Sequence, residues 1–221
     1  MIFKTCAQVA TRDSMFLFGI SSDKTWRMVI YRPQTYVERL NLSQLFPKAQ
    51  PLEVELGSGD GSFLIEWCRQ HPERNFIGVE RLLGRLRKLE RKGLRAGLTN
   101  LRGIRLEASY VIEYLLPISS VQALHVYFPD PWPKRKHRKH RLVNSQFTDV
   151  AAKILATDGV VFLRTDHADY FGQMTEVFGA NSNFSAMETP DDLSAVLTDF
   201  EREFQARGVS TLRATFRKNS Q

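Results

Sequence analysis

The sequence of 221 residues has only two cysteines, Cys6 and Cys68, and few long apolar runs. Two distant cysteines exclude a disulfide framework and a cysteine-rich metal site, and they favour a reducing compartment such as the cytoplasm. The apolar stretch at residues 15–20 is too short for a signal sequence or a membrane span. No two of the five histidines have HExxH spacing, so no zinc site is expected. The sequence therefore predicts a soluble, cytoplasmic protein without a metal.

Positive charge is abundant, with 31 Lys and Arg against 24 Asp and Glu and a net charge of +7. Residues 134–141 read KRKHRKHR, and such a dense block of one sign usually marks a contact with a polyanion. Residues 81–95 carry further basic side chains around Leu82, Leu86 and Leu89, which predicts an amphipathic helix with a basic outer face. A solvated charged surface is the alternative for both segments.

Short apolar runs alternate with helical patterns from residue 52 onward. Strands are expected at residues 52–56, 75–80, 101–106, 121–128 and 159–164, and helices at residues 62–70, 82–95, 110–115, 142–156 and 168–179. This alternation predicts an α/β fold, a mostly parallel sheet with helices on both faces. Residues 183–187 and 211–218 would add an antiparallel edge. Residues 1–50 are expected to form an amino-terminal cap in the same domain as residues 51–221.

A glycine-rich turn, ELGSGDG, follows the first of these strands. Gly57, Gly59 and Gly61 stand at alternate positions, where they permit a tight turn and a close approach of the backbone to a ligand. The spacing GxGxG differs from the dinucleotide fingerprint GxGxxG, and Glu55 stands two residues before it. A carboxylate there would repel a pyrophosphate and suits a cationic ligand, which disfavours a nicotinamide oxidoreductase.

Acidic residues also follow the next two strands. Glu80 is placed to accept hydrogen bonds from a ribose diol, and Glu107 and Ala108 lie where an adenine edge would be recognised. S-adenosylmethionine carries an ammonium and a sulfonium and no phosphate, so a glycine turn flanked by carboxylates fits this cofactor. Ordinary surface acids are the alternative for each glutamate taken singly.

The segment FPDPWPKRKHR begins at Phe128, where the fourth strand ends. Its prolines cannot donate to a sheet, so PDPWP must leave the strand as a loop. Asp130 and Trp132 therefore lie at the carboxyl edge of the sheet, where parallel sheets bind ligands. Trp132 suits stacking on a base, and it equally suits a structural place between two prolines.

Together these motifs resemble the bacterial tRNA (guanine-N7-)-methyltransferase family, from about Glu53 to the carboxyl terminus. The resemblance rests on FPDPWPK, ELGSGDG, GVE at residues 78–80, TDH at 165–167 and TDFE at 198–201. It implies a Rossmann-like class I methyltransferase that methylates N7 of guanine 46 in the tRNA variable loop. Glu107 stands where the family more usually has Asp, and His140 stands where it commonly has Arg.

The resemblance also implies roles for individual residues. Contacts with S-adenosylmethionine are expected from Glu55, Gly57, Gly59, Gly61, Glu80, Glu107, Ala108 and Asp130. Substrate contacts are expected from Lys134, Asp166, Thr198, Asp199, Phe200 and Glu201. The basic block would contact RNA through Lys136, His137, Arg138, Lys139, His140 and Arg141. Residues 198–201 also fit the S/T-x-x-E pattern of a helix capping box, which is a structural alternative.

The chemistry of guanine N7 points to catalysis mainly by positioning. N7 carries a lone pair and no proton, so it needs no general base, and near-attack alignment can supply about 7 to 11 kcal/mol. Methylation makes the purine cationic. A carboxylate that faces N1–H and the exocyclic amine would select guanine and stabilise the developing charge. Asp130 and Asp166 are the predicted catalytic residues.

Two other functions remain open at this point. A class I methyltransferase acting on another RNA, a protein or a small molecule would explain the glycine turn and leave the basic block without a role. A catalytically silent RNA-binding module would explain the charge and leave the strand-end acids without one. The expected partner is tRNA, with no membrane and no metal, and the expected state is a monomer or homodimer.

Overall fold

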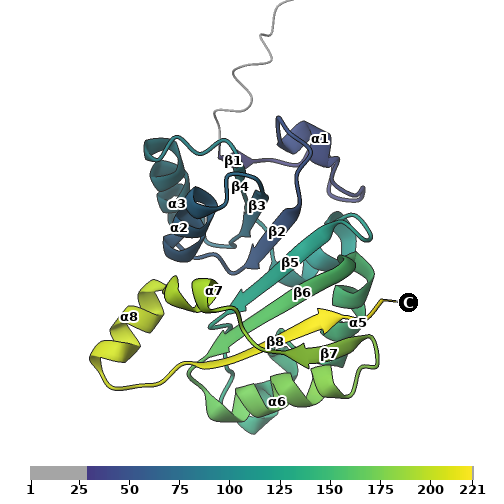
Figure 1. Ribbon diagram of the computed structural model, residues 1–221, viewed down its shortest axis with the longest axis vertical. Coiled ribbons are helices and arrows are strands. Elements are labelled where there is room, and N and C mark those ends of the chain that lie inside the picture. The colour runs from purple at the N-terminus through teal and green to yellow at the C-terminus, as the bar shows by residue number, and fades with distance from the viewer. Residues whose placement is uncertain (1–28, 221) are drawn as a thin grey trace, which may run out of the picture.

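The computed structural model describes residues 29–220, so the first part of the predicted cap lies outside it. Within these residues, one eight-stranded sheet has the order β1-β4-β3-β2-β5-β6-β8-β7 (Figure 1). β1 to β6 run parallel to one another, and β8 is antiparallel to both β6 and β7. The strands are β1 (Ile30–Tyr31), β2 (Leu52–Leu56), β3 (Asn75–Val79), β4 (Leu101–Ile104), β5 (Val121–Tyr127), β6 (Leu155–Thr165), β7 (Phe184–Met187) and β8 (Leu212–Lys218).

Helices cover both faces of the sheet, and each face has its own apolar core. On one face, α2, α3 and α7 pack over residues such as Phe76 and Phe162. On the other, η2, α5 and α6 pack over residues such as Val54 and Val126. The helices are α1 (Leu42–Leu45), α2 (Ser62–Gln70), α3 (Leu83–Arg95), α4 (Ala108–Tyr110), the π-helix η2 (Val111–Leu115), the 3₁₀-helix η3 (Arg135–His140), α5 (Ser145–Ile154), α6 (Ala168–Gly179), α7 (Asp191–Ala195) and α8 (Asp199–Ala206).

The central strand β2 is buried along its whole length. Side chains alternate between the two faces of a strand, so Leu52, Val54 and Leu56 enter the core beneath η2 and α5. Glu53 and Glu55 consequently face the opposite side, toward α2. Two buried carboxyl groups in a central strand require polar partners or a ligand.

The predicted α/β architecture is confirmed, and the bounds of β2, α2 and α6 agree with the prediction. The helix predicted at residues 142–156 is shorter than expected. Asn144 accepts a hydrogen bond from the Phe147 amide and caps α5 at Ser145, and Leu155 already belongs to β6. In the described part of the chain, no helix is long and apolar enough to cross a membrane.

Four features of the fold were not predicted. β1 pairs with β4 at one edge of the sheet, the basic block forms η3, and α7 and α8 lie between β7 and β8. The antiparallel β7 and β8 confirm the expected edge. In Figure 1, α8 projects to the left from the carboxyl ends of the parallel strands, on the same side as α3.

Candidate functional site

A pocket opens at the carboxyl end of β2, between the glycine turn, α3 and α8. Its lining residues are Glu55, Gly57, Ser58, Gly59, Asp60, Ser62, Arg85, Lys88, Tyr127, Phe128, Thr198, Asp199, Phe200 and Glu203. Parallel sheets bind ligands at this edge, next to the strand where the order of connections reverses. β2 is that strand, because β3 lies on one side of it and β5 on the other.

The glycine turn leaves its backbone open to a ligand. Gly57 and Gly59 have φ angles of +79° and +56°, which glycine adopts at little cost. A Cβ atom built on either would meet nothing within 4 Å. Gly61 serves a different purpose, since a Cβ there would lie 2.9 Å from Cγ of Leu89 on α3. The first two glycines therefore face the pocket, and the third permits close helix packing.

Two polar atoms in the pocket wall have no hydrogen-bond partner in the described structure, Oε2 of Glu55 and Oγ of Ser58. Burial raises the pKa of Glu55 to about 8, and the charges of Asp60 and Glu80 add to the effect despite the opposing charge of Arg164. A buried acceptor without a partner is costly, and a cationic ligand would relieve that cost. The pocket thus fits a ligand with a positive charge near Glu55.

Glu80 organises the glycine turn. Its Oε2 accepts a hydrogen bond from the Gly59 amide at 3.1 Å, and its Oε1 accepts one from the Leu82 amide at 2.6 Å. Glu80 is buried, whereas Glu107 is exposed, with one oxygen 3.9 Å from Nε of Arg81. Neither glutamate lines the pocket, so their predicted contacts with the cofactor stay predictions.

A hydrogen-bonded network beneath the pocket fixes the end of β5. His125 is fully buried, with Nε2 2.8 Å from Oε2 of Glu53 and Nδ1 2.8 Å from the hydroxyl of Tyr127. Glu53 also accepts hydrogen bonds from Trp67 and Arg74. Burial opposes ionisation of Glu53, but these hydrogen bonds and the attraction of His125 lower its pKa to about 2. Tyr127 is thereby held against the pocket.

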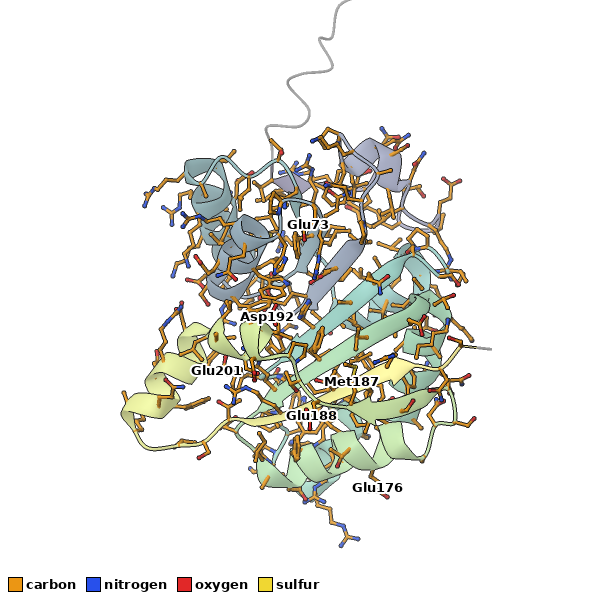
Figure 2. The ribbon with its side chains drawn as sticks, in the orientation of Figure 1. Glu73, Glu176, Met187, Glu188, Asp192 and Glu201 are labelled. Carbon is orange, nitrogen blue, oxygen red and sulfur yellow. The ribbon has the colours of Figure 1, made fainter. Side chains whose placement is uncertain are left out.

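α8 forms the opposite wall, and Glu201 fixes it to the sheet (Figure 2). Its Oε2 accepts hydrogen bonds from Arg164 of β6 and from the Thr198 amide, and its Oε1 accepts one from Arg213 of β8. The Glu201 amide donates to the hydroxyl of Thr198, which completes a capping box. The capping box predicted as the alternative for residues 198–201 is therefore confirmed. Glu201 is fully buried and does not line the pocket.

Residues next to Glu201 do reach the pocket. Thr198, Asp199 and Phe200 line it, and the Asp199 amide donates to the hydroxyl of Ser62 at 3.2 Å. Phe200 is 46% exposed, and its ring centroid lies 5.9 Å from that of Phe128. Three of the four residues of the TDFE segment therefore line the pocket, and their predicted contacts with the substrate stay predictions.

The loop after β5 has an unusual backbone. Phe128 and Trp132 have φ angles of 49° and 42°, a left-handed region that bulky residues rarely adopt. Such strain persists only where the surroundings impose it, and it concentrates at functional sites. Asp130 within this loop and Asp166 after β6 are both exposed and lie outside the pocket lining.

Most of the basic block faces solvent, but its last residue does not. Lys134, Lys136, Arg138, Lys139 and His140 are exposed, and His137 is half-buried beside the Trp132 ring. Arg141 is only 1% exposed. Its guanidinium donates to the Pro131 carbonyl, Gln173 and Asp169. The prediction that Arg141 contacts RNA is therefore wrong, because this residue fixes the loop to α6.

Sequence reasoning missed eight of the fourteen residues that line the pocket. Ser58, Asp60 and Ser62 lie within or beside the recognised turn, whereas Tyr127 and Phe128 become neighbours of Glu55 only once β5 pairs with β2. Arg85, Lys88 and Glu203 come from helices that reach the pocket by tertiary packing. No group of three or more potential metal ligands occurs among residues 29–220.

Solved structures share this fold. A 16S rRNA methyltransferase, KamB, superimposes with a TM-score of 0.61 at 16% identity, over 83% of this chain and 95% of that one. TrmN from Thermus thermophilus gives a TM-score of 0.55 at 17% identity, over 77% of this chain and 45% of that one. At these identities the likeness establishes the class I methyltransferase fold alone.

Sequence comparison identifies the family more closely. Residues 49–214 match the family described as "Putative methyltransferase". A tRNA (guanine-N(7)-)-methyltransferase of Thermotoga maritima is 30% identical over 85% of this chain and 60% of its own length, less than two thirds. Proteins of the same name from Sodalis glossinidius and Aliivibrio fischeri are 33% and 32% identical, over 76% and 84% of this chain and 73% and 80% of their own. The chain belongs to the tRNA (guanine-N(7)-)-methyltransferase family.

Proposed function

We propose that this protein transfers the methyl group of S-adenosyl-L-methionine to N7 of a guanine in tRNA, in the cytoplasm, and that the target is guanine 46 of the variable loop. The observation that carries the proposal is a pocket suited to a cation beside an exposed block of positive charge. Phe128 lines the pocket, and the basic block begins six residues later at Lys134. One loop thus connects the place for the methyl donor with a surface for a polyanion.

The glycine turn and Glu55 would hold the cofactor. The open backbone at Gly57 and Gly59 admits a ligand, and the unpaired oxygens of Glu55 and Ser58 offer acceptors to its ammonium group. Glu80 would act mainly by fixing the turn, since both of its oxygens already accept backbone amides. The bound cofactor supplies a methyl group on a positively charged sulfur, which the lone pair of guanine N7 can accept without a general base.

Positioning of the purine would then control the rate. Asp130 and Asp166 are exposed at the carboxyl edge, free to accept hydrogen bonds from guanine N1–H and the exocyclic amine. A carboxylate in that position stabilises the positive charge that develops on the ring as N7 is alkylated. Thr198, Asp199 and Phe200 would close the pocket over the base, supported from below by the buried Glu201.

Incubation of an unmodified tRNA transcript with the protein and methyl-labelled S-adenosylmethionine tests the proposal. Reduction and aniline treatment then cleave the RNA at N7-methylguanosine. We expect one cleavage, in the variable loop, and none in a transcript with adenine at position 46. Labelled RNA that is not cleaved would show that the protein is a methyltransferase whose target is not N7. No label on any RNA would favour a protein or small-molecule substrate.

Two variants separate the pocket from the rest of the protein. Glu55→Gln should weaken binding of the cofactor, because a neutral amide cannot compensate the ammonium charge. Glu176→Gln removes an exposed carboxylate on α6, far from the pocket (Figure 2), and should leave cofactor binding and methylation unchanged. Equal cofactor affinity in the two variants would contradict the role of Glu55.

A further inference from the structure

The outer face of α3 carries positive charge that the rest of the described structure does not neutralise. Arg87, Arg91 and Arg95 are exposed, and none of them forms an ion pair with a carboxylate among residues 29–220. A helix turns by about 100° per residue, so these three side chains point nearly opposite to the buried Leu86 and Leu89. The packing of α3 therefore fixes its arginines toward solvent.

Two acidic groups at α3, Asp60 and Glu90, already have partners other than these three arginines. Oδ2 of Asp60 lies 2.9 Å from Nζ of Lys92, and Oε1 of Glu90 accepts a hydrogen bond from the Ile30 amide at 3.3 Å. Arg87, Arg91 and Arg95 follow one another at i,i+4 spacing, where like charges destabilise a helix. A face with this unrelieved repulsion is complementary to a partner with regularly spaced negative charge.

The same positive surface continues to the mouth of the pocket. Arg85 and Lys88 of α3 line the pocket, as does Phe128. Phe128 begins the loop that leads to the exposed basic block at Lys134. α3 lies on the outside of the molecule, at the left of Figure 1. α3 thus brings positive charge directly to the pocket, and the loop after Phe128 connects the pocket with the basic block.

From these observations we infer that the outer face of α3 binds the phosphate backbone of the RNA substrate, so that the RNA contacts both sides of the pocket. The inference rests on the proposed function and adds a second RNA-binding surface to it. Arg87 and Arg95 are eight residues apart, or about 12 Å along the helix axis. With one phosphate neutralised by each arginine, this face can neutralise about three phosphates of the RNA backbone.

Titration of unmodified tRNA with the protein at several KCl concentrations tests the inference. In the triple variant Arg87→Gln, Arg91→Gln, Arg95→Gln, the slope of log Kd against log salt should decrease by about 2 to 3, since each lost phosphate contact removes about 0.7 to 0.9. At about 100 mM salt we expect Kd for tRNA to increase at least about tenfold. The affinity for S-adenosylmethionine should not change, because none of the three residues lines the pocket.

Two matched variants make the result specific. Arg87→Lys, Arg91→Lys, Arg95→Lys keeps the charge and should keep most of the affinity for tRNA. Retained affinity in this variant would show that the glutamine variant binds weakly because it lacks charge, and not because it is misfolded. Lys153→Gln, Arg217→Gln removes two positive charges near the amino end of β6, where both residues are exposed. This control should bind tRNA like the unmodified protein, apart from the small effect of net charge.

The outcomes distinguish this inference from the proposed function. If the unmodified protein methylates tRNA while the glutamine variant of α3 and the Lys153 control have the same Kd and salt slope, the α3 surface is not part of the RNA interface. If the unmodified protein neither binds nor methylates tRNA, the proposed function itself is wrong. Weaker binding in the α3 glutamine variant alone, with recovery in the lysine variant, establishes the inference.

Discussion

Glu53 and Glu55 lie on the same face of β2, yet their replacement by glutamine should change stability in opposite directions. Glu53 has three hydrogen-bonding partners, His125, Trp67 and Arg74, and its pKa falls from 4.5 to about 2. Glu55 has an oxygen without a partner, and burial raises its pKa from 4.5 to about 8. The folded state favours the ionised form of one carboxyl group and the neutral form of the other.

The lowered pKa of Glu53 corresponds to stabilisation of about 3 kcal/mol, at 1.36 kcal/mol per pKa unit. This stability is present above pH 4.5 and is lost as the pH falls toward 2, because the folded state must then bind a proton that it disfavours. Glu53→Gln also leaves His125 and Arg74 without a carboxylate. We expect it to lower the free energy of unfolding by about 3 to 5 kcal/mol at pH 7.

The raised pKa of Glu55 has the opposite sign. Above pH 4.5 the unfolded chain releases the Glu55 proton while the folded protein retains it, so stability falls as the pH rises toward 8. At pH 7 this cost is about 3 kcal/mol. Glutamine resembles the protonated acid and does not ionise in either state. Glu55→Gln should therefore raise the free energy of unfolding of the cofactor-free protein by about 2 to 3 kcal/mol.

Urea unfolding of the cofactor-free variants at pH 5, 6, 7 and 8 measures both effects, with Glu176→Gln as the exposed control. We expect the advantage of Glu55→Gln over the unmodified protein to shrink toward zero as the pH falls to 5. A Glu55→Gln variant that is less stable at pH 7, or whose difference does not depend on pH, would refute the reasoning. So would a Glu53→Gln variant as stable as the control.

Three further results are expected. Binding of S-adenosylmethionine at pH 7 should release close to one proton, because a cation beside Glu55 ionises a carboxyl whose pKa is about 8. Calorimetry in buffers of different ionisation enthalpy measures this release, which Glu55→Gln should abolish. Asp166→Ala should reduce kcat by the equivalent of about 2 to 4 kcal/mol, and an unchanged kcat with a higher KM would remove its proposed role. Asp169→Asn should lower Tm and weaken tRNA binding, because Arg138 and Arg141 both form ion pairs with Asp169; unchanged tRNA affinity would show that the basic block does not depend on α6.

The sheet and its crossover helices could be predicted because their local signals agree. β2 and α2 have the bounds expected from an apolar run, a glycine turn and a helical pattern. For α8 the sequence signalled only the start, through the S/T-x-x-E pattern at residues 198–201, and the helix itself was missed for a physical reason. It has eight residues, is mostly exposed, and is held by the capping box and the ion pair between Glu201 and Arg164, a contact that spans 37 residues.

The candidate site was predictable only where its residues are local in sequence. The glycine turn and the TDFE segment were recognised as motifs, but nothing in the sequence shows that Asp199 meets Ser62 from 137 residues away. Arg141 illustrates the reverse error. In a run of eight basic residues, charge alone does not distinguish the one that folds inward to Asp169 and the Tyr170 ring from those that face solvent.

The two walls of the pocket come from segments that are far apart in the sequence, and this has a consequence for synthesis of the protein. The glycine turn at residues 57–61 leaves the ribosome well before the α8 wall and before Arg213 of β8, which holds Glu201. Domains fold as synthesis proceeds from the amino terminus. A nascent chain therefore carries a glycine turn with only one wall, and a complete binding pocket forms only once β8 has joined the sheet.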